Sequence, residues 1–190
     1  RVSLGGLAAR PSTPLRIRGR APVLGWAPLS LASPGDGLAA RVLDLYQHRD
    51  PFLAVALQKG LDADRMAADD KMGKTMKPKG GLDNAAGMRQ SAQGAAKLMA
   101  ADDGPRIAAL AFDGWDTHVN EGGATGRLAN LLGGLDGAFE EFEKGLGERW
   151  KDTAVVTITE FGRSARINGT TGTDHGTGTV VLLAGGAVKG

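Results

Sequence analysis

Two of the three histidines in this chain stand close to aspartates in short segments with small neighbours. His118 follows Asp113 and Asp116, and His175 directly follows Asp174 on a run of glycine and threonine. Carboxylate oxygens and neutral imidazole nitrogens are ligands that divalent metals take from proteins, and a flexible backbone lets both be aimed at one point. We therefore predict a divalent-metal site with five candidate ligands: Asp113, Asp116, His118, Asp174 and His175.

Each candidate ligand also has a plain structural explanation. Asp113 and Asp116 could cap a helix, Asp174 could form a turn, and His118 could be a half-buried histidine bonded to backbone. What favours a metal is that these residues fall on loops next to three expected strands. Successive side chains alternate in an extended strand, so Asp174 and its neighbour are expected on a glycine-flanked turn.

Two further charged residues follow the strand expected at 153–159. Glu160 could bind the metal, act as a base beside it or be an acid at a helix N-terminus. Arg163 could bind an anion or pair with Glu160. These two residues are the catalytic candidates, whereas His48, at a helix junction, is expected on the surface.

The spacing of apolar residues predicts the elements that must position these side chains. Helices are expected from Asp36, from Pro51, over 83–99 and over 127–146, and strands at 106–112, 153–159 and 179–184. This order is typical of an α/β fold with a mainly parallel, buried sheet. In such sheets functional groups gather beyond the carboxyl ends of the strands. The candidates at 113–118 and 160–163 follow expected strands, whereas Asp174 and His175 lie on the loop that precedes the last strand.

Composition limits the other possibilities. A chain of 190 residues with 42% hydrophobic residues suits one domain over 1–190, with a proline-broken, loop-like start at 1–35 and an exposed lysine- and glycine-rich loop at 68–82. The absence of cysteine excludes disulfides and thiolate ligands, and no apolar run is long enough to span a membrane. Residues 1–35 carry five arginines and no acid, which is typical of a targeting or nucleic-acid arm. The rest has 18 basic against 21 acidic residues, so no nucleic-acid partner is expected.

The segments around the candidate site resemble one bacterial family. The runs that carry the resemblance are Asp113–His118, Thr159–Arg163, Asn168–Gly178 and Leu183–Gly186. They resemble the family catalogued as domain of unknown function 1501, which is placed in the alkaline phosphatase/sulfatase superfamily. The resemblance implies a doubly wound, alkaline-phosphatase-like sheet with helices on both faces. It also implies a site for one or two divalent ions, with zinc expected and calcium or magnesium left open.

The resemblance also implies an activity and a location. It implies hydrolysis of phosphate or sulfate esters by an exported protein, periplasmic or secreted, often with a twin-arginine signal. Asp174 and His175 match the superfamily's Asp-His metal pair. Its second pair has an aspartate four residues before a histidine, a spacing that neither Asp113 nor Asp116 has to His118; we favour Asp116 and keep Asp113 as the alternative ligand. The superfamily's nucleophile, on an early strand, has no counterpart here, so this chain is expected to be a piece of a longer protein. The alternative is a non-catalytic secreted or surface binding protein that keeps the fold.

Overall fold

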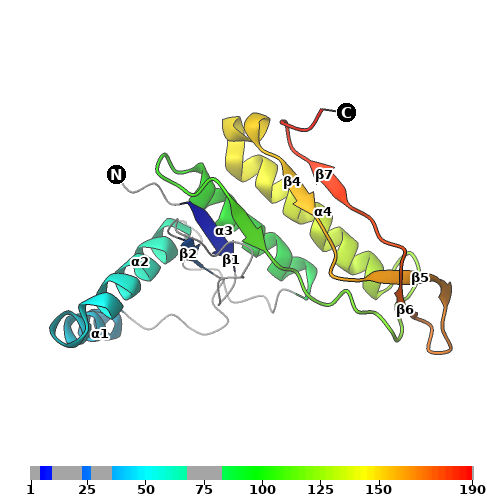
Figure 1. Ribbon diagram of the computed structural model, residues 1–190, viewed down its shortest axis with the longest axis horizontal. Coiled ribbons are helices and arrows are strands. Elements are labelled where there is room, and N and C mark those ends of the chain that lie inside the picture. Colours follow the sequence, from blue (N-terminus) through cyan, green and yellow to red (C-terminus); the bar gives the residue numbers. More distant parts are fainter. Residues whose placement is uncertain (1–4, 10–22, 27–35, 68–82, 190) are drawn as a thin grey trace. The chain divides into compact units, whose positions relative to one another are not determined.

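A computed structural model describes residues 5–9, 23–26, 36–67 and 83–189 (Figure 1). The chain combines helices with parallel and antiparallel strands, as an α/β protein does. It divides into two compact units: the first comprises residues 1–79 and 97–111, and the second comprises residues 80–96 and 112–190. The predicted loop at 68–82 and most of the predicted start at 1–35 lie outside the described residues. None of the described helices has the length and apolar character needed to traverse a bilayer.

The first unit holds a small parallel sheet and a pair of helices. The strands β1 (Gly6–Ala9), β2 (Val23–Gly25) and β3 (Ala108–Leu110) run parallel in the order β2-β1-β3. The helices are α1 (Asp36–Arg49) and α2 (Pro51–Ala67). Asp50 caps α2, because its Oδ1 accepts hydrogen bonds from the backbone N–H groups of Phe52 and Leu53 at 3.1 Å. The predicted helix starts at Asp36 and Pro51 are therefore confirmed.

The second unit contains the remaining elements. Helix α4 (Arg127–Leu146) has the predicted bounds and leads into the short helix η2 (Gly147–Asp152). Helix α3 (Ala85–Ala100) starts in this unit, two residues after the predicted position. Strands β4 (Val155–Thr157) and β7 (Leu182–Ala184) form one antiparallel pair, and β5 (Gly162–Ile167) and β6 (Thr173–Gly176) form another (Figure 1). The elements of the first pair were predicted, whereas the second pair was expected to be loop.

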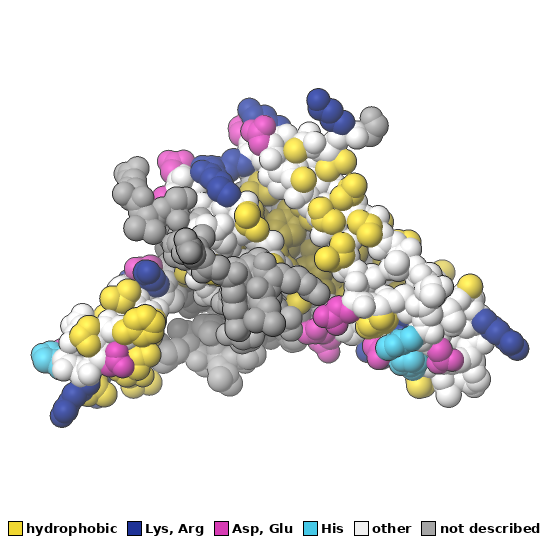
Figure 2. Space-filling view, in the orientation of Figure 1, with side chains coloured by type: hydrophobic (Ala, Val, Ile, Leu, Met, Phe, Trp, Pro, Cys, Tyr) yellow, Lys and Arg dark blue, Asp and Glu magenta, His cyan; other side chains and the backbone are white. Residues whose placement is uncertain are grey.

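The pairing of β4 with β7 corrects part of the predicted sheet. Both apolar runs were expected to be buried in a mainly parallel sheet, but they are antiparallel to each other. Val156, on β4, is 55% exposed and Leu183, on β7, is 59% exposed. Figure 2 shows hydrophobic side chains gathered over this ribbon. A continuous apolar run predicts a strand, but it does not specify the direction of the partner strand.

Helices α3 and α4 approach closely within the second unit. Gly134 on α4 is buried, and a Cβ atom there would lie 2.6 Å from Cα of Ala85. Arg89 on α3 donates to Glu140 on α4 at 2.9 Å, and Lys144 donates to the same carboxylate at 2.6 Å. The small residue thus permits contact between the helices, and the Arg89–Glu140 ion pair joins them, whereas the Lys144–Glu140 pair lies within α4.

We expect Gly134→Ala to destabilise the protein and its neighbour Gly133→Ala to stabilise it. The methyl group at 134 would force the backbone at Ala85 to move, which costs about 1–3 kcal/mol. Nothing lies within 4 Å of a Cβ at Gly133, where the gain in helix propensity is about 1 kcal/mol. Urea unfolding of both variants measures the difference, and equal stabilities would contradict the packing described here.

Candidate metal site

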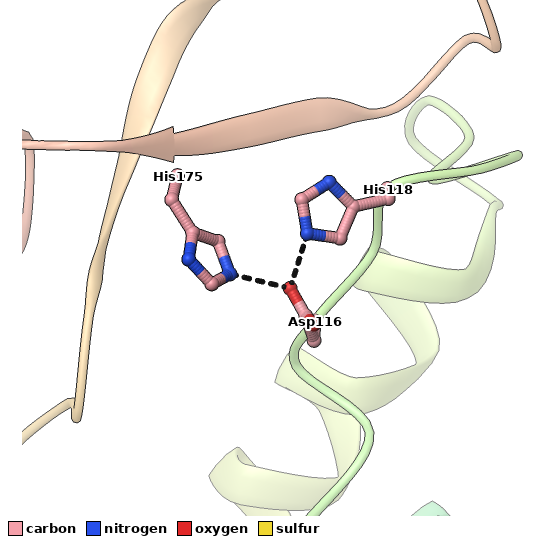
Figure 3. Close-up of side chains that lie close together, drawn as sticks. All are labelled: Asp116, His118 and His175. Carbon is pink, nitrogen blue, oxygen red and sulfur yellow. Dashed lines mark hydrogen bonds and ion pairs between the residues drawn. The ribbon is translucent and has the colours of Figure 1, made fainter.

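Three predicted ligands converge in the second unit (Figure 3). Oδ1 of Asp116 lies 2.9 Å from Nε2 of His118 and 3.0 Å from Nε2 of His175. The two imidazole rings are 5.0 Å apart between centroids. Each of the three residues offers one possible ligand atom, and these three atoms all lie within 4.8 Å of one another. We call Asp116, His118 and His175 the metal-site triad.

The backbone of the loop after residue 113 is tied to the β5–β6 hairpin, which explains why residues distant in sequence meet. Val119 forms an isolated antiparallel bridge with Thr171. On either side of it, the N–H of Thr173 donates to the carbonyl of Thr117 at 3.3 Å, and that of Asn120 donates to Thr170 at 3.0 Å. The loop therefore acts as a third strand-like segment beside the hairpin, and it brings Asp116 and His118 to the strand that carries His175.

Residues 173–176 form the strand β6 and not the expected turn. Because side chains alternate along a strand, Asp174 and His175 do not reach the same point. His175 meets Asp116, whereas Oδ1 of Asp174 lies 3.2 Å from Nδ1 of His118. The ring of His118 is therefore held between two carboxylates, and Asp174 lies outside the triad.

Asn168 organises the turn of the hairpin. Its side-chain oxygen accepts from the backbone N–H groups of Thr170 and Gly172, both at 3.0 Å. Its Nδ2 donates to Oδ1 of Asp174 at 2.9 Å and to the carbonyl of His118 at 3.0 Å. The sequence did not predict this role for Asn168; the signal was its place at the head of a glycine- and threonine-rich turn, where Asn bonds to nearby backbone.

Arg163 lies next to the triad, and each of its three guanidinium nitrogens donates a hydrogen bond. Its Nη1 donates to Oδ1 of Asp116 at 2.7 Å, its Nε to Oγ1 of Thr173 at 3.0 Å and its Nη2 to the carbonyl of Thr173 at 2.5 Å. Thr173 in turn donates to Glu121 at 2.9 Å. Only 21% of the Arg163 side chain is exposed, so it is fixed in place. This network positions the Asp116 carboxylate toward the two imidazoles.

Phe161 supports the ring of His175. Its ring stacks on that of His175 with centroids 4.4 Å apart and an interplanar angle of 15°, and the guanidinium carbon of Arg163 lies 5.6 Å from the Phe161 centroid. Phe161 belongs to the segment that follows β4, and its role was not predicted. Stacking limits the rotation of the His175 ring and so directs its Nε2 toward Asp116.

Two candidate residues are not brought to the triad. Asp113 and Glu160 are both exposed, and neither makes a hydrogen bond or ion pair with any residue in the described part of the chain. The catalytic roles of Glu160 and Arg163 therefore stay predictions. Of the two aspartates that precede His118, the structure brings Asp116 and not Asp113 into the group.

The cluster stabilises ionised carboxylates. The pKa of Asp116 is lowered from its ordinary 3.8, chiefly by the hydrogen bond from His175 and further by that from Arg163, against partial desolvation. The pKa of Asp174 is also lowered, first by Asn168 and then by His118. Both carboxylates therefore stay charged in mildly acidic solution, the form in which a carboxylate binds a cation.

These shifts predict how stability depends on pH. A carboxyl group whose pKa is lower in the folded state stabilises that state above its unfolded pKa, and the contribution is lost as pH falls through the folded pKa. We expect Asp116→Asn to unfold at lower urea concentration than the unsubstituted protein at pH 6. We expect the difference to shrink as pH falls below about 3.8. A difference independent of pH would show that Asp116 is not preferentially ionised in the folded protein.

The donor set fits a divalent ion that prefers nitrogen and oxygen. Tetrahedral zinc with bonds of about 2.0–2.1 Å has ligand atoms about 3.3 Å apart, close to the nitrogen–oxygen distances in the triad. The second carboxylate on Nδ1 of His118 is the arrangement that commonly orients a metal-binding imidazole. Asp116 accepts from Arg163 and still has lone pairs to offer, because a carboxylate has about four.

The sequence comparisons give the family and nothing more specific. A family model described as "Protein of unknown function (DUF1501)" matches residues 27–190, which include all seven candidate site residues. Neither the curated proteins nor the solved structures contain a significant match to the chain. Because the matched segment covers most of the sequence, the chain belongs to the DUF1501 family.

Proposed function

We propose that this chain supplies part of the metal site of a hydrolase that cleaves phosphate or sulfate esters. The observation that carries the proposal is the meeting of two imidazole Nε2 atoms on one oxygen of Asp116, at 2.9 and 3.0 Å. The proposal includes the predicted kinship with the alkaline phosphatases and sulfatases, their doubly wound sheet and an exported location. Zinc is the expected ion, because the donor set is two imidazoles and a carboxylate.

Each residue around the triad has a defined task in this proposal. A bound divalent ion would polarise the ester oxygens and lower the pKa of a water or hydroxyl nucleophile. Asp174 keeps a proton on Nδ1 of His118, so that the lone pair of Nε2 is free for the ion. Phe161 holds the ring of His175, and Arg163 holds the carboxylate of Asp116. Glu160 is the candidate for orienting a water molecule beside the ion.

Hydrolysis by the full-length protein that carries this sequence tests the proposal. We expect the zinc-loaded protein to hydrolyse p-nitrophenyl phosphate or p-nitrophenyl sulfate. Because Oδ1 of Asp116 is the atom that both imidazole nitrogens approach, and is the oxygen donor of the proposed site, Asp116→Asn should lower both the zinc content and kcat/KM, the latter by at least about a hundredfold.

The matched control is Asp44→Asn, which changes an exposed aspartate that contacts His48 in the first unit. It should leave both quantities unchanged. Zinc binding without turnover of either ester would contradict the hydrolase and favour the non-catalytic binding protein. Turnover that survives Asp116→Asn would place the chemistry elsewhere.

A further inference from the structure

A hollow of about 410 Å³ lies beside the triad in the second unit. The hollow is lined by residues from the segment between β4 and β5, from the start of β5 and from the segment that leads to β7: Thr159, Phe161, Arg163, Gly178, Thr179 and Val180. The hollow is shallow and open to solvent on one side, so it can contact one face of a small group. Because the triad does not include any of these residues, the hollow is a separate feature next to the candidate metal site.

Two lining residues connect the hollow to the triad directly. Phe161 lines the hollow and stacks on His175 with ring centroids 4.4 Å apart. Arg163 lines it and donates to Asp116 at 2.7 Å. A group bound in the hollow would thus lie one side chain away from the atoms proposed to hold the ion.

The hollow is suited to an apolar group. Each of the three guanidinium nitrogens of Arg163 already donates to Thr173 or Asp116. The hydroxyl groups of Thr159 and Thr179 bond to each other at 2.5 Å. These bonds use three of the five N–H groups of Arg163 and one of the two threonine hydroxyl hydrogens, so few polar groups are left for a ligand. Most of the exposed lining is apolar, and it includes the side chain of Val180, which is 66% exposed. Covering such apolar surface favours binding, whereas most hydroxyl groups of a sugar would exchange their bonds to water for apolar contact there.

We propose that this hollow receives the organic part of the ester, and that the substrates are therefore esters of apolar alcohols or phenols and not of sugars. This inference rests on the proposed function. The anionic group of such an ester would face the triad, and its apolar group would pack against Phe161 and Val180. Val180 is then a specificity-determining residue, although it does not contact the triad.

Binding of two phosphonates, which cannot be hydrolysed at the carbon–phosphorus bond, tests the hollow without requiring activity. Phenylphosphonate and methylphosphonate carry the same anionic group and differ in their apolar part. With the metal-free protein and with the zinc-loaded protein, we expect phenylphosphonate to bind about tenfold more tightly. The Kd values are measured by calorimetry or by NMR titration of the Val180 methyl groups.

Val180→Asn should reduce the preference for the phenyl compound at least about threefold, because it replaces apolar lining with an amide. The control is Val156→Asn on β4, since Val156 is 55% exposed but does not line the hollow. Equal affinity for the two phosphonates, or equal effects of the two substitutions, would overturn the inference. If the protein prefers phenylphosphonate but hydrolyses neither p-nitrophenyl phosphate nor p-nitrophenyl sulfate, the hollow still binds an apolar group. Only the proposed hydrolase activity is then contradicted.

Discussion

Replacing His175 with alanine is expected to lower the affinity of the protein for Zn²⁺ by at least about a hundredfold. Loss of a residue that only orients a ligand costs about 10–100-fold, and the loss of a ligand itself should cost no less. The variant should remain folded, because the His175 side chain is 55% exposed and lies at the surface of the hairpin. Competition titration with a zinc-binding dye measures the change.

Three further variants make this prediction specific. His118→Ala should weaken binding as strongly as His175→Ala, because both rings supply Nε2 to the same group. Asp174→Asn should have the smaller effect of an orienting residue, about 10–100-fold. His48→Ala removes the third histidine of the chain, which is 74% exposed and pairs with Asp44 on α1, and it should change nothing. If all three histidine variants weakened zinc binding equally, the ion would be held by histidines in general and not at the triad.

Gly172→Ala is expected to destabilise the hairpin by about 2 kcal/mol or more and to weaken zinc binding with it. Gly172 is buried, and a Cβ there would lie 2.3 Å from the backbone carbon and oxygen of His118 and 2.4 Å from the carbonyl oxygen of Thr117. Because these neighbours are backbone atoms, the loop that carries His118 would have to move away from the strand that carries His175. Urea unfolding and a zinc titration measure the two effects.

Gly169→Ala provides the matched control in the same turn. Gly169 is exposed, and nothing lies within 4 Å of the position of its Cβ. The substitution should leave both stability and zinc affinity within error of the unsubstituted protein. Equal effects at positions 169 and 172 would mean that the turn as a whole, and not the close approach at Gly172, holds the two segments together.

Local patterns in the sequence were sufficient to predict most of the helices and strands. The apolar residues of 127–146 recur at steps of three and four, and α4 has those bounds. Asp50 followed by Pro51 predicted the start of α2, because an aspartate cap and a proline in the first turn are strong local signals. Such signals act within a few residues, so a single sequence contains them.

Pairings between distant residues could not be derived in the same way. The residue types and loops predicted that Asp116, His118 and His175 would meet, but the strand character of β6 and the separation of Asp174 from the triad depend on long-range backbone bonds. The roles of Asn168 and Phe161 depend on which side chains lie across the hairpin. A run of glycine and threonine is equally compatible with a turn and with a twisted strand, and tertiary contacts decide between them.

X-ray absorption spectroscopy of the protein loaded with one equivalent of zinc tests the central claim most directly. The account predicts scattering from two imidazole rings and from carboxylate oxygen, with the imidazole contribution halved in either His118→Ala or His175→Ala and unchanged in His48→Ala. A spectrum without imidazole scattering, or one unaffected by removal of His118 and His175, would contradict a metal site at Asp116, His118 and His175.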